Sequence, residues 1–142
     1  KFGVIVAGYT DNIHMFIESN PGFKSRFDKT FVFDDYKPEQ LWQITKNLLA
    51  KENLTATPEA EAHIISYLTG LYENRDAFFG NARTARQVVG DVVMKQNLRL
   101  ASMPSDKRKK EDLVQLTYDD VKHLVVQSGG NRATLGFKFG QE

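Results

Sequence analysis

The sequence contains no cysteine among its 142 residues, and it has no excess of charge of one sign. Without cysteine, a disulfide framework, a thiol nucleophile and a thiolate metal site are excluded. The 19 lysines and arginines balance 18 aspartates and glutamates to a net charge of +1. This balance argues against a charged disordered segment and against a strongly basic nucleic-acid binder. Long apolar runs are missing too, since none approaches the ~18 residues that cross a bilayer.

The N-terminus lacks an initiator methionine and the features of a secretory signal. Residues 1–6 (KFGVIV) combine one lysine with an apolar run that is too short for a signal peptide. No small-residue cleavage site follows this run. We therefore expect a cytoplasmic protein, and we expect the chain to be part of a longer polypeptide.

The sequence also lacks a phosphate-binding loop. Such a loop places a Gly-Lys-Ser/Thr step at a helix N-terminus, where backbone amides surround the phosphates. In the nearest segment, residues 22–25 (GFKS), a phenylalanine separates glycine from lysine. Asp34 and Asp35 follow an apolar run, as metal-holding carboxylates at the end of a strand do. With no such loop upstream, we interpret them as ordinary acidic residues before a helix N-terminus.

The first 36 residues show the order strand, helix, strand of a wound α/β domain. Residues 2–9 (FGVIVAGY) form an apolar run without alternation, typical of a strand covered on both faces. A short helix is expected next, with Asp11 or Asn12 as its N-cap, and Asn20-Pro21-Gly22 ends it. Residues 30–33 (TFVF) predict a second strand.

After residue 36 the pattern becomes helical. Helices are expected to begin at Pro38, after Thr57, after Gly80-Asn81 and at Thr117, which forms a capping box with Asp120. An exposed linker is expected over 102–112 and a glycine-rich tail over 129–142. The inward-facing residues expected on these helices are Leu41, Ile44, Leu48, Leu49, Ile64, Ile65, Leu68, Leu71, Tyr72, Ala85, Val88, Val89, Val92, Val93, Val121, Leu124 and Val125.

Three arginines stand where a phosphate could be bound. Arg26 lies on a loop before the second expected strand, and a guanidinium can stabilise charge on a transferring phosphoryl group. The alternative for Arg26 is a local ion pair with Asp28. Arg83 and Arg86 lie in the first turns of the third helix, where cations oppose the helix dipole and a bound anion would compensate.

The alternative for these two helix arginines is pairing with Glu73 or Asp76.

The histidines at positions 14, 63 and 123 have no metal-like spacing, so no metal site is expected. The basic run 107–110 (KRKK) is flanked by acids and not interleaved with aromatics, which favours a solvated loop over a nucleic-acid contact.

Taken together, five segments resemble the C-terminal part of an AAA+ ATPase, of the group that contains CbbX and stage V sporulation protein K. The order and spacing of these segments cover residues 2 to about 101. The matching segments are Val4 to Tyr9, Asn20 to Phe27, Tyr36 to Leu41, Leu54 to Ala60 and Phe79 to Arg86.

The resemblance implies a role for each matched residue. The strand from Val4 to Tyr9 would end in sensor 1 and place Tyr9 or Thr10 near the γ-phosphate of ATP. Thr10 is preferred, because its hydroxyl can orient the attacking water. Arg26 would be the arginine finger that reaches the neighbouring subunit's ATP. Arg83 would be sensor 2, and Ile44 and Gly80 would lie near the adenine. The complete protein would bind ATP with Mg²⁺, hydrolyse it in a ring expected to be a hexamer, and remodel a protein partner.

The resemblance also implies a mainly α fold in three parts. Residues 1–36 would be the end of the α/β core, with two strands and a helix, 37–128 a four-helix lid domain, and 129–142 a flexible tail. The core's P-loop strand would lie between the two strands present, so these should not pair with each other. Residues 1–36 should then be disordered, dimerised through strand edges or completed by another chain.

A different class of function stays open on the sequence. Four helices could form a non-enzymatic protein-interaction module, with Phe137 and Phe139 as a docking tail. Such an adaptor has no need of an arginine at the start of the third helix, which favours the ATPase interpretation. Because the chain lacks a phosphate-binding loop, we expect no ATP hydrolysis from this fragment alone.

Overall fold

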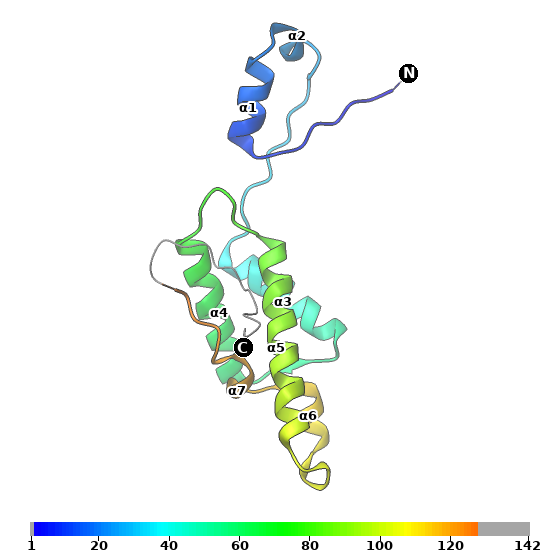
Figure 1. Cartoon of the computed structure of the whole chain (residues 1–142), viewed down its shortest axis with the longest axis vertical. Helices are drawn as coiled ribbons and strands as arrows, with labels where there is room; N and C mark the ends of the chain where they lie inside the picture. The colour runs from blue at the N-terminus through cyan, green and yellow to red at the C-terminus, as the bar shows by residue number, and fades with distance from the viewer. Residues whose placement is uncertain (1, 128–142) are drawn as a thin grey trace, which may run out of the picture.

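The computed structural model describes residues 2–127, which form an N-terminal segment followed by a helical bundle (Figure 1). The prediction of a mainly helical protein is confirmed. The elements are α1 (Thr10–Glu18), α2 (Pro21–Lys24), α3 (Pro38–Lys51), β1 (Thr55–Ala56), α4 (Pro58–Glu73), α5 (Ala82–Ser102), a 3₁₀ turn (Ser105–Lys107), α6 (Lys110–Val114), β2 (Gln115–Leu116) and α7 (Tyr118–Val121).

The helices of the bundle begin where the sequence predicts. Pro38 and Pro58 occupy the first turns of α3 and α4, where a missing N–H costs nothing. The Thr57 hydroxyl accepts a hydrogen bond from the backbone of α4, and the capping box of Thr117 and Asp120 is confirmed at α7. Position 37 carries lysine, yet the Gln40 side chain still accepts the Lys37 N–H at 2.9 Å.

The core lies where α3, α4, α5 and α7 meet. Most of the apolar residues predicted to face inward are buried there, and full burial of each stabilises the fold by roughly 1.5–3 kcal/mol. Thr45 is buried as well, with its hydroxyl donating to the Leu41 carbonyl at 2.8 Å. Val125, which the helical pattern places inside, is 66% exposed, because α7 ends at Val121 and the chain continues without helix.

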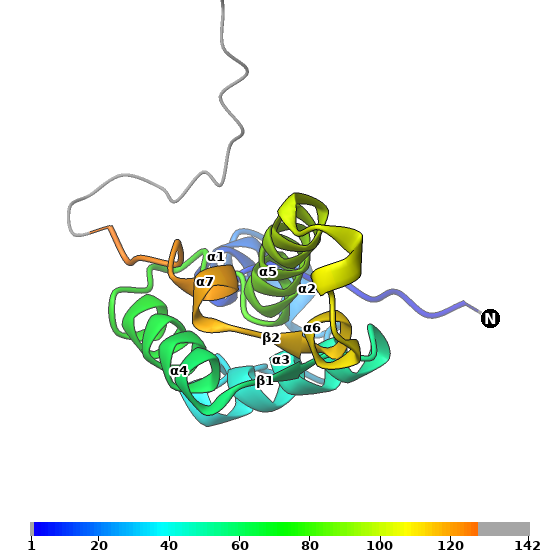
Figure 2. The same ribbon diagram turned by 90° about the horizontal axis from the view of Figure 1, so that it is seen from below.

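A two-stranded parallel sheet, formed by β1 and β2, is absent from the sequence prediction. Thr55 pairs with Gln115 and Ala56 with Leu116, and Figure 2 shows the pair between the helices. The Thr57 N–H extends the contact to the Leu116 carbonyl at 3.0 Å. These two-residue strands tie the loop before α4 to the loop before α7.

The two strands predicted in the N-terminal segment are not formed. Within residues 2–36 the structure has α1 and α2 but no strand, and Phe2, Ile5 and Phe33 are 93%, 95% and 92% exposed. A strand needs a hydrogen-bonded neighbour, and neither apolar run finds one, in agreement with the expectation that they do not pair with each other. The predicted N-cap of α1 is also wrong, because Tyr9 holds that position without a side-chain bond.

The segment 102–112 is less irregular than predicted, since it contains the 3₁₀ turn and the start of α6. The tail 129–142, with Phe137 and Phe139, lies outside the described residues. None of the described helices has the length and apolar character that a membrane span requires.

Candidate functional site

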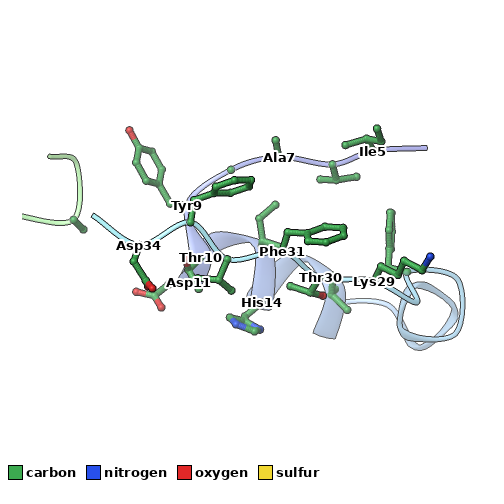
Figure 3. Close-up of a pocket in the computed structure, with 18 of the residues that line it drawn as sticks. Ile5, Ala7, Tyr9, Thr10, Asp11, His14, Lys29, Thr30, Phe31 and Asp34 are labelled. Atoms are coloured by element: carbon green, nitrogen blue, oxygen red, sulfur yellow. The ribbon is translucent and has the colours of Figure 1, made fainter. Parts of the chain in front are cut away.

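A cleft of about 850 Å³ lies between the two extended runs of the N-terminal segment. In Figure 3, Ile5 and Ala7 lie on one run, and Thr30 and Phe31 on the other. Residues 77, 79 and 81 of the loop between α4 and α5 complete the lining. The cleft therefore adjoins both parts of the described chain.

Arg26 lines this cleft from the turn after α2. Its N–H donates to the Phe23 carbonyl at 2.9 Å, and the Phe23 ring stacks on Phe16 with centroids 4.9 Å apart and meets Phe27 edge-on at 6.0 Å. These aromatic contacts brace the turn that carries the guanidinium. Within the described residues Arg26 has no ion pair, so the alternative pair with Asp28 is not formed.

Thr10 lines the same cleft as the first residue of α1. The structure thus brings the two expected catalytic residues, Thr10 and Arg26, to one cavity. Four carboxylates, those of Asp11, Asp28, Asp34 and Asp35, also line it. Over residues 2–127, no group of three or more acidic or histidine side chains is arranged to hold a metal ion.

The other expected site residues lie in the bundle and do not line this cleft. Arg83 and Arg86 are exposed in the first turns of α5, and neither pairs with a carboxylate in the part of the chain that the structure describes. Ile44 is half-buried on α3. Gly80 packs closely on α5, because a Cβ there would lie 2.7 Å from the Thr84 hydroxyl.

Asp35, Arg75 and Asn81 connect the N-terminal segment to the bundle through contacts that the sequence interpretation missed. Asp35 accepts from Arg75 Nε at 3.0 Å on one carboxylate oxygen and from Asn81 Nδ2 at 2.7 Å on the other. Asn81 Oδ1 in turn accepts the Tyr36 N–H at 2.8 Å. The Arg75 guanidinium lies 3.8 Å from the centre of the Tyr72 ring, an additional cation–π contact. Besides preceding the N-terminus of α3, Asp35 therefore takes part in this junction.

The backbone of Asn81 is unusual at this junction. Its φ of 50° and ψ of −121° lie in a region that glycine adopts easily and other residues at a cost of about 1–3 kcal/mol. Asn81 is the N-cap of α5, yet its side chain makes no capping bond. The Asn81 amide instead forms hydrogen bonds with Asp35 and Tyr36 of the linker. In the sequence, the only sign of this contact is the Gly-Asn step before the helix.

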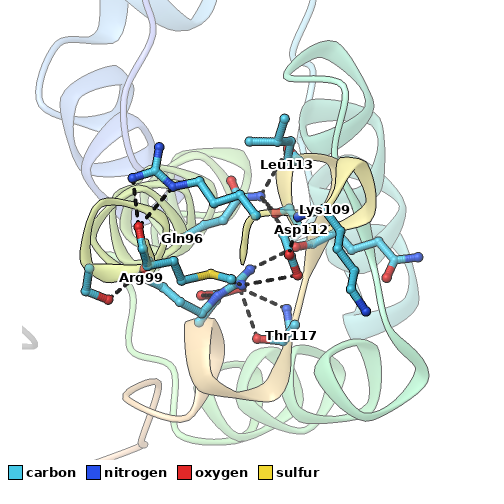
Figure 4. A network of polar contacts seen from close by, with 11 residues as sticks. Gln96, Arg99, Lys109, Asp112, Leu113 and Thr117 are labelled. Atoms are coloured by element: carbon cyan, nitrogen blue, oxygen red, sulfur yellow. Dashed lines mark hydrogen bonds and ion pairs between the residues drawn. The ribbon is translucent and has the colours of Figure 1, made fainter. Parts of the chain in front are cut away.

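A second polar network holds the far end of α5 and has a structural role. Arg99 binds the buried Asp120 through Nε at 2.8 Å and Nη2 at 3.0 Å, and hydrogen bonding to Asp120 raises the pKa of Arg99. Gln96 donates to the carbonyls of Asp112 and Leu113, each at 3.3 Å (Figure 4). The network lies on α5, α6 and α7, and none of its residues lines the cleft.

Comparison with known proteins identifies a family for the helical bundle. Residues 37–128 match the family described as the AAA lid domain. The chain belongs to the AAA lid domain family. This lid domain contains α3 to α7, and its first turn lies directly after the junction of Asp35 and Tyr36.

The similarity extends beyond the lid domain. The chain is 35% identical to protein CbbX of Cereibacter sphaeroides over 127 residues, 89% of this chain and 40% of that protein. It is 36% identical over 118 residues to the chloroplastic ribulose bisphosphate carboxylase/oxygenase activase of Cyanidioschyzon merolae, 83% of this chain and 40% of that protein. The CfxQ protein of Xanthobacter flavus is 39% identical over 97 residues, 68% of this chain and 30% of that protein.

The chain thus spans about 40% of the length of the first of these relatives. The resemblance to the C-terminal part of a CbbX-like AAA+ ATPase, inferred from five short segments of the sequence, is confirmed by these matches.

Proposed function

We propose that this chain is the lid and arginine-finger portion of an AAA+ ATPase that binds and hydrolyses ATP in a ring and remodels a protein partner. Residues 1–36 are then the end of the α/β core, 37–128 the lid domain and 129–142 a tail. The observation that carries the proposal is that Arg26 and Arg83 are exposed and have no carboxylate partner among residues 2–127.

The chemistry of these side chains fits the phosphates of ATP. A guanidinium offers several N–H donors in a planar fork and keeps its charge at every physiological pH. Arg26 supplies it from a braced turn to the nucleotide of a neighbouring subunit, and Arg83 supplies it to the nucleotide of its own subunit. The Thr10 hydroxyl orients the attacking water, while Ile44 and Gly80 contact the adenine.

ATP with Mg²⁺ requires further residues that this sequence does not contain, because it has no Gly-Lys-Ser/Thr step. The fragment alone is therefore expected to be inactive as an ATPase. In the full-length protein the extended runs on either side of the cleft become strands when a strand from the rest of the core lies between them. That addition pairs their free backbone groups and covers their exposed apolar side chains.

The test is an Arg26→Ala substitution in the full-length protein. Removal of the arginine finger should lower kcat by about 10³–10⁵-fold, because the charge that develops on the transferring phosphoryl group loses its partner. ATP binding, measured with a fluorescent ATP analogue, should stay within about threefold of wild type, since the finger acts mainly in the transition state.

Lys24→Ala serves as the matched control, because Lys24 is an exposed cation two residues away on the same short segment. It should leave kcat unchanged. Wild-type turnover in the Arg26→Ala protein would remove the arginine-finger assignment, and an equal loss in both variants would indicate a general effect of charge.

A further inference from the structure

Three polar contacts join the linker before α3 to the loop between α4 and α5. They are the Asp35–Arg75 ion pair, the Asn81–Asp35 hydrogen bond and the Tyr36–Asn81 hydrogen bond, at 3.0, 2.7 and 2.8 Å. A fourth contact, between the Tyr9 and Phe78 rings at 4.8 Å, joins the same loop to the start of α1. The orientation of the lid on the N-terminal segment therefore depends on this small set of contacts.

Asn81 holds the key position in this set. It keeps a left-handed backbone although it is not glycine, and its amide does not cap the helix that it precedes. Both ends of the amide are instead engaged with the linker, Nδ2 with Asp35 and Oδ1 with the Tyr36 N–H. We propose that Asp35, Arg75 and Asn81 form a hinge latch that sets the direction of the first turn of α5, and Arg83 with it, relative to the segment that carries Arg26.

The path from the latch to Arg83 is short. Arg83 is two residues after Asn81, and its N–H donates to the Gly80 carbonyl at 2.9 Å. The Ala85 N–H donates to the Asn81 carbonyl at 3.3 Å. A rotation at Asn81 therefore moves the whole first turn of α5. Asn81 is therefore a positioning residue, and its expected effect on ATP binding rests on the proposed function.

The Asn81→Gly variant tests the latch without a large expected effect on the stability of the fold. Glycine adopts a φ of 50° without steric cost, so the relief of backbone strain should offset the loss of the three side-chain hydrogen bonds, to Asp35, Tyr36 and the Phe79 carbonyl, and the variant should still fold. Asn53→Gly is the matched control, because Asn53 is the other non-glycine residue with positive φ in the described range, at 58°, and has no contact with the linker.

Lid orientation can be measured without ATP. The chain has no cysteine, so Glu18→Cys and Asn97→Cys, both exposed, place one spin label on α1 and one on α5. The labels are introduced in the full-length protein with any cysteines outside this chain replaced. Pulsed electron resonance should give a narrow distance distribution for wild type and Asn53→Gly, and a broad or shifted one for Asn81→Gly. Equal distributions in all three proteins would overturn the latch.

A swap of the two side chains tests the pairing itself. Asn81→Asp alone places a second carboxylate against Asp35 and should broaden the distribution. The double variant Asn81→Asp with Asp35→Asn restores one donor and one acceptor to the pair. The amide at position 35 can turn its oxygen to Arg75 and its nitrogen to the carboxylate at position 81. The double variant should recover the narrow distribution. Failure to recover, with both proteins folded, would contradict the pairing.

The consequence for nucleotide is measured by equilibrium binding of ATP. Asn81→Gly should weaken binding by about 3- to 10-fold, as expected for a misplaced charged contact, and should cause no further loss in an Arg83→Ala background. Additive losses would show that Asn81 does not act through Arg83. If the wild-type protein bound no ATP, the proposed function would fail, while the distance measurements would still decide whether the latch exists.

Discussion

At the scale of single residues, Arg83 is an exposed cation at a place where a helix disfavours one. It lies in the first turn of α5, and no carboxylate among residues 2–127 pairs with it. A cation there costs ~0.3–1 kcal/mol against the helix dipole. Sequence reasoning could find this residue, because the unfavourable position of the charge is visible from the start of the helix alone.

Arg83→Ala should weaken ATP binding by about 10- to 150-fold, the equivalent of one hydrogen bond to a charged group. The thermal midpoint should stay the same or rise slightly, because an unfavourable charge is removed from the helix N-terminus. Binding is measured by titration with a fluorescent ATP analogue and stability by circular dichroism. Lys95→Ala, an exposed cation further along α5, is the control and should not change ATP affinity. Unaltered affinity in Arg83→Ala would refute its sensor role.

The hinge latch was not predictable in the same way. Asp35 meets Arg75 and Asn81 across 40 and 46 residues of sequence, and such contacts depend on how α4 and α5 bring their connecting loop back to the linker. The sequence interpretation of Asp34 and Asp35 as acids before a helix uses only their local neighbours. The positive φ of Asn81 likewise follows from the fold.

At the scale of elements, local signals predicted the starts of α3, α4, α5 and α7 well, because proline, threonine and the capping box act within one turn. The β1–β2 pair was missed since each strand has two residues and its partner lies about 60 positions away. The strands expected at 2–9 and 30–33 were wrong for this chain because apolar runs become strands only beside a hydrogen-bonding partner.

At the scale of elements, Asp120 joins α5 to the start of α7 and should matter for stability. Its side chain is 1% exposed and accepts one hydrogen bond from the Thr117 N–H and two from the Arg99 guanidinium. Asp120→Ala should lower the free energy of unfolding by about 3 kcal/mol, because it leaves the Arg99 charge and the start of α7 without their partner. The measurement is urea unfolding followed by circular dichroism.

Asp119→Ala is the matched control for Asp120→Ala. Asp119 is the preceding residue, and its ion pair with Lys122 is exposed to solvent, with side-chain exposures of 68% for Asp119 and 57% for Lys122. Its unfolding midpoint should move much less than that of Asp120→Ala. Equal shifts in the two variants would mean that burial of the Arg99–Asp120 pair does not matter for the stability of the bundle.

At the scale of the whole molecule, the two parts of the chain differ in how far their apolar side chains are buried. The lid domain has its own core of buried side chains from four helices, whereas no residue of α1 or α2 is buried. The N-terminal segment exposes phenylalanine, valine and isoleucine side chains on its extended runs. Such surfaces require cover, and in the proposed ring the remaining core strands and a neighbouring subunit provide it.

The central claim is that Arg26 acts on ATP bound by a neighbouring subunit, and subunit mixing tests it most directly. Full-length Arg26→Ala protein is mixed with full-length protein in which the lysine of the phosphate-binding loop that the proposal requires is replaced by alanine. Each protein alone should be inactive. Mixed rings should hydrolyse ATP, because an intact nucleotide site then meets an intact finger across a subunit boundary. No recovery at any mixing ratio, in rings shown to exchange subunits, would contradict the account.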